Sequence, residues 1–144
     1  MKVVETGQVV GEIDKGLFVL VGVKKGDNLE DAEMLAVKLF KIRIMADEND
    51  KMNLTVRDVK GQMLVVSQFT LYADTSSGNR PSFINAALPD EAKKIYEHFV
   101  AKLKELGAAG PVADSGESLT RREGPLARRV KTGSFGDYMQ INAD

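Results

Sequence analysis

The sequence predicts an α+β fold, built as a single domain over residues 1–144. Two observations indicate this class. Segments with helical spacing and segments with strand character do not alternate strictly, as they would in a doubly wound α/β protein. The length of 144 residues suits one domain, and 43% apolar with 28% charged residues is an ordinary mixture for a chain that buries its own core.

The first half of the chain is expected to begin with a hairpin. Residues 8–13 and 17–23 have strand character, and Gly16 between them suits the positive φ of a tight turn. A helix is predicted from Asn28, a favourable N-cap residue, to about Ile44. Its apolar residues fall on one stripe, as a core-facing helix needs. The stripe consists of Leu29, Ala32, Leu35, Ala36, Leu39 and Phe40.

The second half is expected to supply the central strand. Residues 54–59 and 62–74 have strand character, and the run Met63-Leu64-Val65-Val66 lacks alternation, which indicates burial on both faces. A second helix is predicted from Pro89, a favoured first-turn residue, to about Leu106. Alternation returns over residues 135–143, which indicates a last strand.

Residues 108–129 differ from the rest of the chain. They are rich in Gly, Pro, Ser and charged residues and have little periodicity. They predict a flexible loop of a length that is uncommon inside compact domains.

The residue inventory excludes several kinds of chemistry. The chain has 0 Cys, which removes disulfides, thiolate nucleophiles and zinc–thiolate sites. The single His, His98, is the only candidate for a His-based triad. A net charge of −1 argues against non-specific coating of DNA but is compatible with a local basic patch that meets RNA. Neither a membrane-spanning apolar run nor a signal-peptide stretch is seen, so a cytoplasmic location is expected.

Hydrogen-bonding side chains follow the apolar run directly, in Ser67-Gln68-Phe69-Thr70-Leu71. Buried hydroxyl and amide groups cost free energy unless they have partners, so such a cluster is either well satisfied or functional. The alternative interpretation is a strand that emerges into solvent, with Ser and Thr present for their β propensity.

Four further segments, taken with Ser67 to Leu71, resemble the D-aminoacyl-tRNA deacylase family. The Ser-Gln-Phe-Thr-Leu segment is the most specific, and Gly133 to Gln140, with its Gly-x-Phe-Gly-x-x-Met pattern, supports it. The other matching segments are Leu17 to Val23, Asp50 to Leu54 and Gly78 to Phe83. The resemblance covers residues 9–107 and 130–141, which is most of the chain.

The resemblance implies an esterase that removes D-amino acids from the terminal ribose of tRNA, for proofreading in translation. It implies a compact domain with a mostly antiparallel sheet or barrel and two main helices. It further implies a homodimer with active sites at the subunit interface. No cofactor and no metal are implied, and the partner is aminoacyl-tRNA. An aminoacyl ester is already activated, so positioning and hydrogen bonds to a developing oxyanion would be the protein's main contributions.

The family match assigns provisional roles to residues of the central segment. Thr70 would lie nearest the scissile ester, either attacking it or donating a hydrogen bond. A nucleophilic Thr needs a base, and the sequence offers none nearby, so we favour the positioning role. Gln68 would hydrogen-bond and orient, Phe69 would shape the pocket around the terminal adenosine, and Ser67 would support them from behind.

Outside the central segment, the candidates for substrate binding each have a structural alternative. Arg80 pairs with a tRNA phosphate or with a carboxylate of a partner, or it is a solvated loop charge. Phe83 and Phe135 stack on a base or pack in the core, with packing favoured, and Met139 is expected to pack there too. His98, beside the apolar stripe of the second helix, is assigned no role.

Two charged clusters also have alternative interpretations. The acidic residues Asp47, Glu48, Asp50 and Asp58 lack the spacing of a calcium-binding loop, which favours a solvated turn. The basic residues of the 108–129 loop and its end either aid solubility or contact the tRNA acceptor arm through phosphates. This cluster consists of Arg121, Arg122, Arg128, Arg129 and Lys131.

Three departures from the family pattern bear on function. The family usually opens with a further strand carrying Gln-Arg, upstream of the one starting here near Gln8, and we expect this chain to lack it. Residues 108–129 align with nothing in the family. The family continues past the last strand to a Gly-Pro dipeptide that rejects L-amino acids, whereas this sequence stops at Asp144. Gly110-Pro111 and Gly124-Pro125 lie in the loop, with no strand-like sequence after them.

The L-rejecting gate therefore maps onto no residue of this sequence. The chain is expected to be truncated or rearranged, or its stereochemical selectivity to be altered. Two hypotheses follow for the function, an active deacylase or a catalytically impaired tRNA- or RNA-binding or assembly module of the same fold. A generic esterase of small metabolites is disfavoured, because Ser67 does not lie in a Gly-x-Ser-x-Gly elbow.

Overall fold

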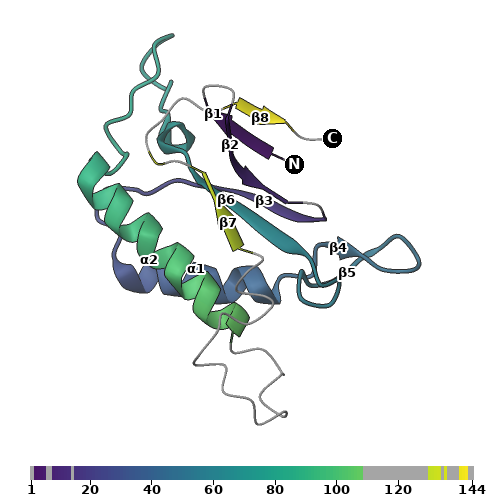
Figure 1. The fold of residues 1–144 in the computed structure, drawn as a ribbon. Coiled ribbons are helices and arrows are strands. Elements are labelled where there is room, and N and C mark those ends of the chain that lie inside the picture. Colours follow the sequence, from purple (N-terminus) through teal and green to yellow (C-terminus); the bar gives the residue numbers. More distant parts are fainter. Residues whose placement is uncertain are drawn as a thin grey trace.

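Strand β6 (Gln62–Ser67) is the centre of the fold (Figure 1). The computed structural model describes residues 2–5, 8–13, 15–108, 130–133, 135 and 140–142. Within β6, Met63 to Val66 are at most 2% exposed, with Met63 and Val65 in one core cluster and Leu64 and Val66 in another. The prediction that this run is buried on both faces is confirmed.

Two parallel neighbours flank β6. Strand β3 (Gly16–Val21) pairs with it from Gly16↔Gln62 to Val21↔Ser67, and β7 (Val130–Thr132) pairs on the other side. The predicted α+β class is confirmed, but a mostly antiparallel sheet or barrel is not, because this central sheet is parallel. A side chain at Gly16 would place Cβ 1.8 Å from the carbonyl oxygen of Gln62, so Gly16 permits the close approach of β3 to β6.

A second sheet is antiparallel and has the order β2-β1-β8. It consists of β1 (Lys2–Glu5), β2 (Gln8–Glu12) and β8 (Gln140–Asn142). The predicted hairpin between residues 8–13 and 17–23 is wrong, because β2 pairs with β1 while β3 pairs with β6. The expectation that the chain lacks a strand upstream of Gln8 is wrong, because β1, with the sequence Lys-Val-Val-Glu, lies there and pairs with β2. Strand β8 lies inside the predicted last strand and pairs with β1.

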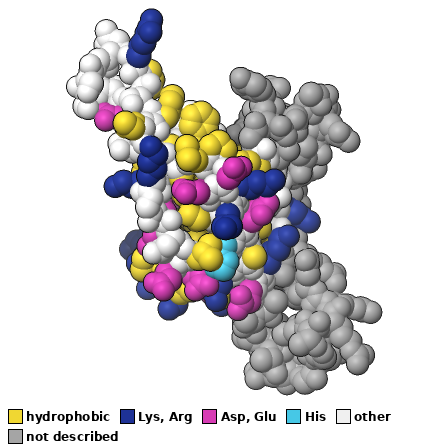
Figure 2. All heavy atoms as spheres, turned by 90° about the vertical axis from the view of Figure 1, so that its left-hand side faces the viewer, with side chains coloured by type: hydrophobic (Ala, Val, Ile, Leu, Met, Phe, Trp, Pro, Cys, Tyr) yellow, Lys and Arg dark blue, Asp and Glu magenta, His cyan; other side chains and the backbone are white. Residues whose placement is uncertain are grey.

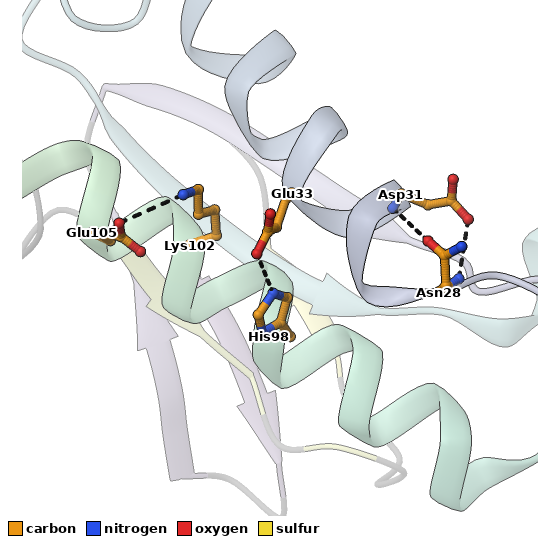
Figure 3. A network of polar contacts seen from close by, with 6 residues as sticks. All are labelled: Asn28, Asp31, Glu33, His98, Lys102 and Glu105. Atoms are coloured by element: carbon orange, nitrogen blue, oxygen red, sulfur yellow. Dashed lines mark hydrogen bonds and ion pairs between the residues drawn. The ribbon is translucent and has the colours of Figure 1, made fainter.

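Both helices lie on one face of the parallel sheet, α1 (Leu29–Lys41) beside α2 (Pro89–Ala108) (Figure 1). Asn28 is the N-cap of α1, as predicted, and exchanges hydrogen bonds of 2.9 and 3.0 Å with Asp31 (Figure 3). Only Ala32, Ala36 and Phe40 of the predicted stripe are buried, and Leu29 and Leu35 are 42% and 59% exposed. The prediction that the whole stripe faces the core is therefore wrong.

The region between α1 and β6 departs from the prediction. A short hairpin of β4 (Met45–Ala46) and β5 (Met52–Leu54) begins where α1 was expected to end, since the helix stops at Lys41. Residues 55–60 form a turn, so the predicted strand 54–59 is wrong. Thr55 and Asp58 each bond the backbone N–H of the other, at 3.2 and 2.8 Å, and this local bonding replaces a strand ladder.

Several predictions lie outside the described residues. These are the 108–129 loop beyond Ala108, both loop Gly-Pro dipeptides, Met139, and the basic cluster except Lys131, which is exposed on β7. In the parts of the chain that the structure describes, neither helix combines the length and apolar character needed to cross a membrane.

Candidate active site

The candidate site lies where β3 and β6 end together. Their register pairs Val21 with Ser67, so both carboxyl ends reach the same edge of the sheet. In open sheets with parallel strands, this edge is where ligands commonly bind, because the chain leaves the strands there and exposes its backbone groups. Ser67 is half-buried at this edge, as expected for a residue that supports the exposed segment after it.

The chain turns sharply after Ser67. The 3₁₀ helix η1 (Phe69–Tyr72) follows, so the predicted strand over 62–74 is too long by the residues beyond Ser67. The backbone N–H of Gln68 still donates to the carbonyl of Val21 at 2.8 Å, and Ala73 N–H donates to the carbonyl of Thr70 at 3.1 Å. Gln68 therefore anchors the start of η1 to the end of β3 and presents the next residues to solvent.

Gln68 and Thr70 are in direct contact. The Nε2 amide of Gln68 donates a hydrogen bond to Oγ1 of Thr70, and Thr70 is exposed while Gln68 is half-buried. The Thr70 oxygen accepts in this contact, so its own O–H remains to be donated to another group. The role of Gln68 toward the ester stays a prediction.

Two aromatic rings meet beside this pair. The ring centroids of Phe69 and Phe83 are 5.0 Å apart at an interplanar angle of 66°, an edge-to-face contact. Both side chains keep a substantial exposed fraction, 56% for Phe69 and 37% for Phe83. The structure thus brings Phe83 to Phe69, although the two residues lie 14 positions apart in sequence.

The segment that carries Phe83 is tied to the end of β3. Ala87 N–H donates to the carbonyl of Val23, and Lys25 N–H donates to the carbonyl of Asn85, both at 2.9 Å. Residues 83–87 and η1 therefore lie against the same end of the same strand, and this fixes the aromatic pair relative to Thr70.

Arg80 lies on a closed loop next to the site. Asp74 and Ser82 exchange two backbone hydrogen bonds of 2.8 Å, and the loop between them projects at the top of Figure 1. Hydrogen bonds from the side chain and backbone of Ser76 hold the pKa of Asp74 below its ordinary value. Arg80 is exposed on this loop, where its guanidinium can reach an anionic ligand.

Exposed apolar side chains lie around the base of the loop between Asp74 and Ser82. Leu71, Ile84 and Leu88 are 52%, 66% and 62% exposed, and Figure 2 shows hydrophobic side chains gathered below the projecting loop. The sequence prediction did not include Ile84 or Leu88. It also missed Gly22, where an added Cβ would lie 3.1 Å from the Leu71 Cβ and from the Tyr72 ring. A Gly at the end of an apolar strand was the available signal for this close approach.

Phe135 and His98 lie elsewhere in the fold. The ring of Phe135 is half-buried and tilted against Tyr96, with centroids 5.9 Å apart. It packs against the core cluster that contains Val23 and Ala87, beneath the segment that carries Phe83. The Nε2 of His98 lies 3.0 Å from a carboxylate oxygen of Glu33 and links α2 to α1 (Figure 3). His98 thus makes a side-chain contact that joins the two helices.

The acidic residues around the short hairpin bond their own backbone. Asp47 accepts from the N–H groups of Asn49 and Lys51 at 2.8 and 3.0 Å, and the Lys51 bond is the main cause that lowers the pKa of Asp47. The Thr55 backbone bond likewise lowers the pKa of Asp58. Over the described ranges, no three His, Cys, Asp or Glu side chains are arranged to hold a metal ion.

Two solved structures of other proteins superpose on the fold described above. A chain named "c-Myc DNA Unwinding Element Binding Protein" superposes with a TM-score of 0.78 at 28% identity, over 96% of this chain and 81% of that one. A chain described as a probable eukaryotic D-amino acid tRNA deacylase superposes with a TM-score of 0.70 at 14% identity, over 96% and 85%, which shows the fold alone.

Sequence comparison identifies the family. Proteins named D-aminoacyl-tRNA deacylase from Thermosipho melanesiensis and Pseudoalteromonas translucida are 44% identical over 138 residues and 48% identical over 128 residues. These matches cover 96% and 87% of this chain and 79% and 88% of the relatives. The family described as D-Tyr-tRNA(Tyr) deacylase matches residues 1–144. The chain belongs to the D-Tyr-tRNA(Tyr) deacylase family.

Proposed function

We propose that this chain hydrolyses the ester bond of D-aminoacyl-tRNA, releasing free tRNA and a D-amino acid. The observation that carries the proposal is the segment Ser67 to Leu71, which leaves a buried parallel strand and exposes Thr70 beside the Gln68 amide. Membership of the family and the names of its relatives support the same activity.

Thr70 acts as a hydrogen-bond donor in this proposal. Its Oγ1 accepts from Gln68, which leaves the hydroxyl proton for the ester carbonyl oxygen, where negative charge develops as water attacks. A nucleophilic Thr70 would need a base to take that proton. The one imidazole of the chain, on His98, is paired with Glu33 on the helices. Gln68 is then a positioning residue that fixes the direction of the Thr70 hydroxyl.

The aromatic pair and the loop bind the tRNA end. Phe69 offers an exposed ring face for the terminal adenosine, and the edge-to-face contact with Phe83 holds that ring in place. Arg80 pairs with a phosphate near the 3′ end from the projecting loop. Phe135 supports the segment of Phe83 from the core, and Met139 stays a predicted member of the substrate-binding group.

The enzyme is proposed to act in the cytoplasm as a homodimer with active sites near the subunit interface. The apolar side chains exposed around η1 support burial of part of this region by substrate or by a second copy.

The direct test is hydrolysis of D-Tyr-tRNA and L-Tyr-tRNA, followed as loss of labelled ester. Wild type is expected to hydrolyse the D form, and its rate on the L form measures how far it selects between the two. Equal rates on both substrates would show that the chain makes no stereochemical selection, and hydrolysis of neither would overturn the proposal.

Variants of Thr70 separate its two mechanistic roles. Thr70→Val keeps the shape but removes the donor, and kcat is expected to fall about 100-fold. Thr70→Ser keeps the donor and is expected to stay within about 10-fold of wild type. Full activity in Thr70→Ala would exclude both a donor and a nucleophile. Gln68→Leu, which leaves Thr70 unoriented, is expected to lower kcat with little change in KM.

A second candidate is a nucleic-acid-binding module without turnover. The solved structure at 28% identity, whose name refers to binding of a DNA unwinding element, favours it. Tight binding of uncharged tRNA together with no ester hydrolysis would select this function over the first.

A further inference from the structure

The chain leaves β3 through a tight turn over residues 24–27, the lysine turn, which carries two adjacent lysines. Asp27 N–H donates to the carbonyl of Lys24 at 3.0 Å, and Lys24 N–H donates back to Oδ2 of Asp27 at 2.8 Å. Gly26 lies at the third position with a φ of 90°, which a type II turn requires and a glycine adopts without strain. The turn is therefore closed twice, and it presents the exposed Lys24 and Lys25 on a fixed backbone.

The lysine turn lies against the segment that carries Phe83. Lys25 N–H donates to the carbonyl of Asn85 at 2.9 Å, and Lys24 pairs with Ala86 in an antiparallel bridge. Asn85 is two residues after Phe83, a separation that spans at most about 7 Å of chain. The ring of Phe83 belongs to the aromatic pair beside the candidate site. The lysine turn is thus a neighbour of the site and is held there by backbone hydrogen bonds.

Backbone groups already engage two carboxylates that follow the lysines in sequence. Asp27 accepts the Lys24 N–H, and Asp31 accepts the backbone N–H of Asn28 at the cap of α1 (Figure 3). Across the residues that the structure describes, the side chains of Lys24 and Lys25 form no ion pair. Both ammonium groups are therefore available to an anionic partner that reaches the site from outside.

We propose that the lysine turn binds backbone phosphates of the tRNA acceptor strand near its 3′ end, an assignment that rests on the function proposed above. With the terminal adenosine on Phe69, the strand that leads to it crosses the surface around the site, where Lys24 and Lys25 extend into solvent. The turn gives this strand a basic contact besides Arg80. Lysine meets a phosphate as a point charge, so the contact positions the strand and reads no base.

A second lysine pair, Lys93 and Lys94 on α2, provides a comparison. Asp90 and Glu91 each lie three residues before one of these lysines, a spacing at which opposite charges are neighbours on a helix. Their carboxylates reduce the positive field of the α2 pair. Lys93→Gln with Lys94→Gln is therefore expected to leave the affinity for tRNA near that of wild type.

Binding of uncharged tRNA, measured by fluorescence anisotropy over a range of KCl concentrations, tests the contact without any need for turnover. Each phosphate contact adds about 0.7–0.9 to the slope of log Kd against log[KCl]. Lys24→Gln with Lys25→Gln is expected to lower this slope by about 1.5 and to weaken binding about 10-fold at low salt. Lys24→Arg with Lys25→Arg keeps both charges and should bind at least as tightly as wild type.

A matched control pair separates the contact from a general effect of charge. Lys41 ends α1 and Lys60 lies just before β6, and both are exposed at the other end of the sheet from the candidate site. Lys41→Gln with Lys60→Gln removes the same charge and should keep the wild-type slope. An unchanged slope in the Gln variant of the lysine turn, an equal loss in the control or the α2 pair, or no binding by wild type at low salt would overturn the proposal.

Two substrates distinguish failure of this contact from failure of the proposed function. The D-tyrosyl ester of adenosine carries no acceptor-strand phosphate, whereas D-Tyr-tRNA carries the whole strand. The Gln variant of the lysine turn is expected to lose about 10-fold more kcat/KM on D-Tyr-tRNA than on the short ester, as a rise in KM. Equal losses on both substrates would refute the phosphate contact. A wild type that binds tRNA but hydrolyses neither substrate would refute the proposed function, and the salt slope would still decide whether the lysines bind phosphate.

Discussion

Gly22→Ala tests whether the end of β3 sets the position of Thr70. The added Cβ would lie 3.1 Å from the Leu71 Cβ and from one carbon of the Tyr72 ring. Carbon atoms prefer about 3.5–4.0 Å, so η1 must retreat by roughly half an ångström. Misplacing a catalytic group by about 1 Å can cost roughly 100-fold in rate, so a shift of this size is expected to lower kcat/KM about 10-fold. The cost in stability should stay near 1 kcal/mol, because η1 is exposed and can yield.

Gly61→Ala is the matched control for this prediction. Its added Cβ would lie 3.1 Å from Val56 Cγ2, a similar crowding, but at the opposite end of β6 from Ser67. It should lower the free energy of unfolding by about 1–2 kcal/mol and leave kcat/KM unchanged. Hydrolysis of D-Tyr-tRNA and urea unfolding are measured for both variants. Wild-type kcat/KM in a folded Gly22→Ala protein would refute the view that β3 positions η1.

Four further predictions concern stability. Burial raises the pKa of Tyr96 to about 12, so its neutral form stabilises the fold below pH 10. This contribution to the free energy of unfolding, measured by urea unfolding, should be lost as pH rises from 10 to 12. Tyr96→Phe removes the 2.8 Å hydrogen bond to the Val65 carbonyl and should cost about 1 kcal/mol at pH 7, while abolishing that alkaline loss. Gly16→Ala, whose Cβ would lie 1.8 Å from the Gln62 oxygen, should cost about 3 kcal/mol or more in the same assay, and near-wild-type stability would contradict the β3–β6 register. The pKa of Asp47 is lower in the folded protein than its ordinary value of 3.8, so the ionised carboxylate stabilises the fold above pH 3.8. The stability difference between wild type and Asp47→Ala should therefore be present at pH 7 and shrink as pH falls below 3.8.

The sequence predicts some elements well because their signals are local. The apolar run of β6 and the Asn28 cap of α1 each depend on a few adjacent residues, and both are confirmed. The partner of β3 depends on a distant strand instead. Gly16 indicated a hairpin turn, whereas its lack of a side chain serves the close approach to Gln62, 46 positions away in sequence.

The sequence predicts which segment forms the candidate site, but it does not predict the shape of that segment. Phe69, Thr70 and Tyr72 have high β propensity, so they continued the strand pattern beyond Ser67. In the structure, Gln68 bonds the Val21 carbonyl and the chain then winds into η1, which turns Thr70 outwards. The contact of Phe69 with Phe83 and the approach of Gly22 to Leu71 arise from this turn. The contact between the two aromatic rings has no signal in the spacing of residues, whereas a Gly at the end of an apolar strand was a signal for the approach of Gly22.

Helix α1 shows how a mismatch between pattern and structure can be informative. Its stripe is wider than a helix needs to pack on one side, and the described fold buries only the half that contains Ala32, Ala36 and Phe40. The small residues Ala32 and Ala36 allow α1 to approach its neighbours, while the larger Leu35 remains exposed beside β3. A sequence in which local pattern and fold agree everywhere leaves no such residue exposed. Leu35 therefore lines a groove between α1 and β3 that the described part of the chain leaves open.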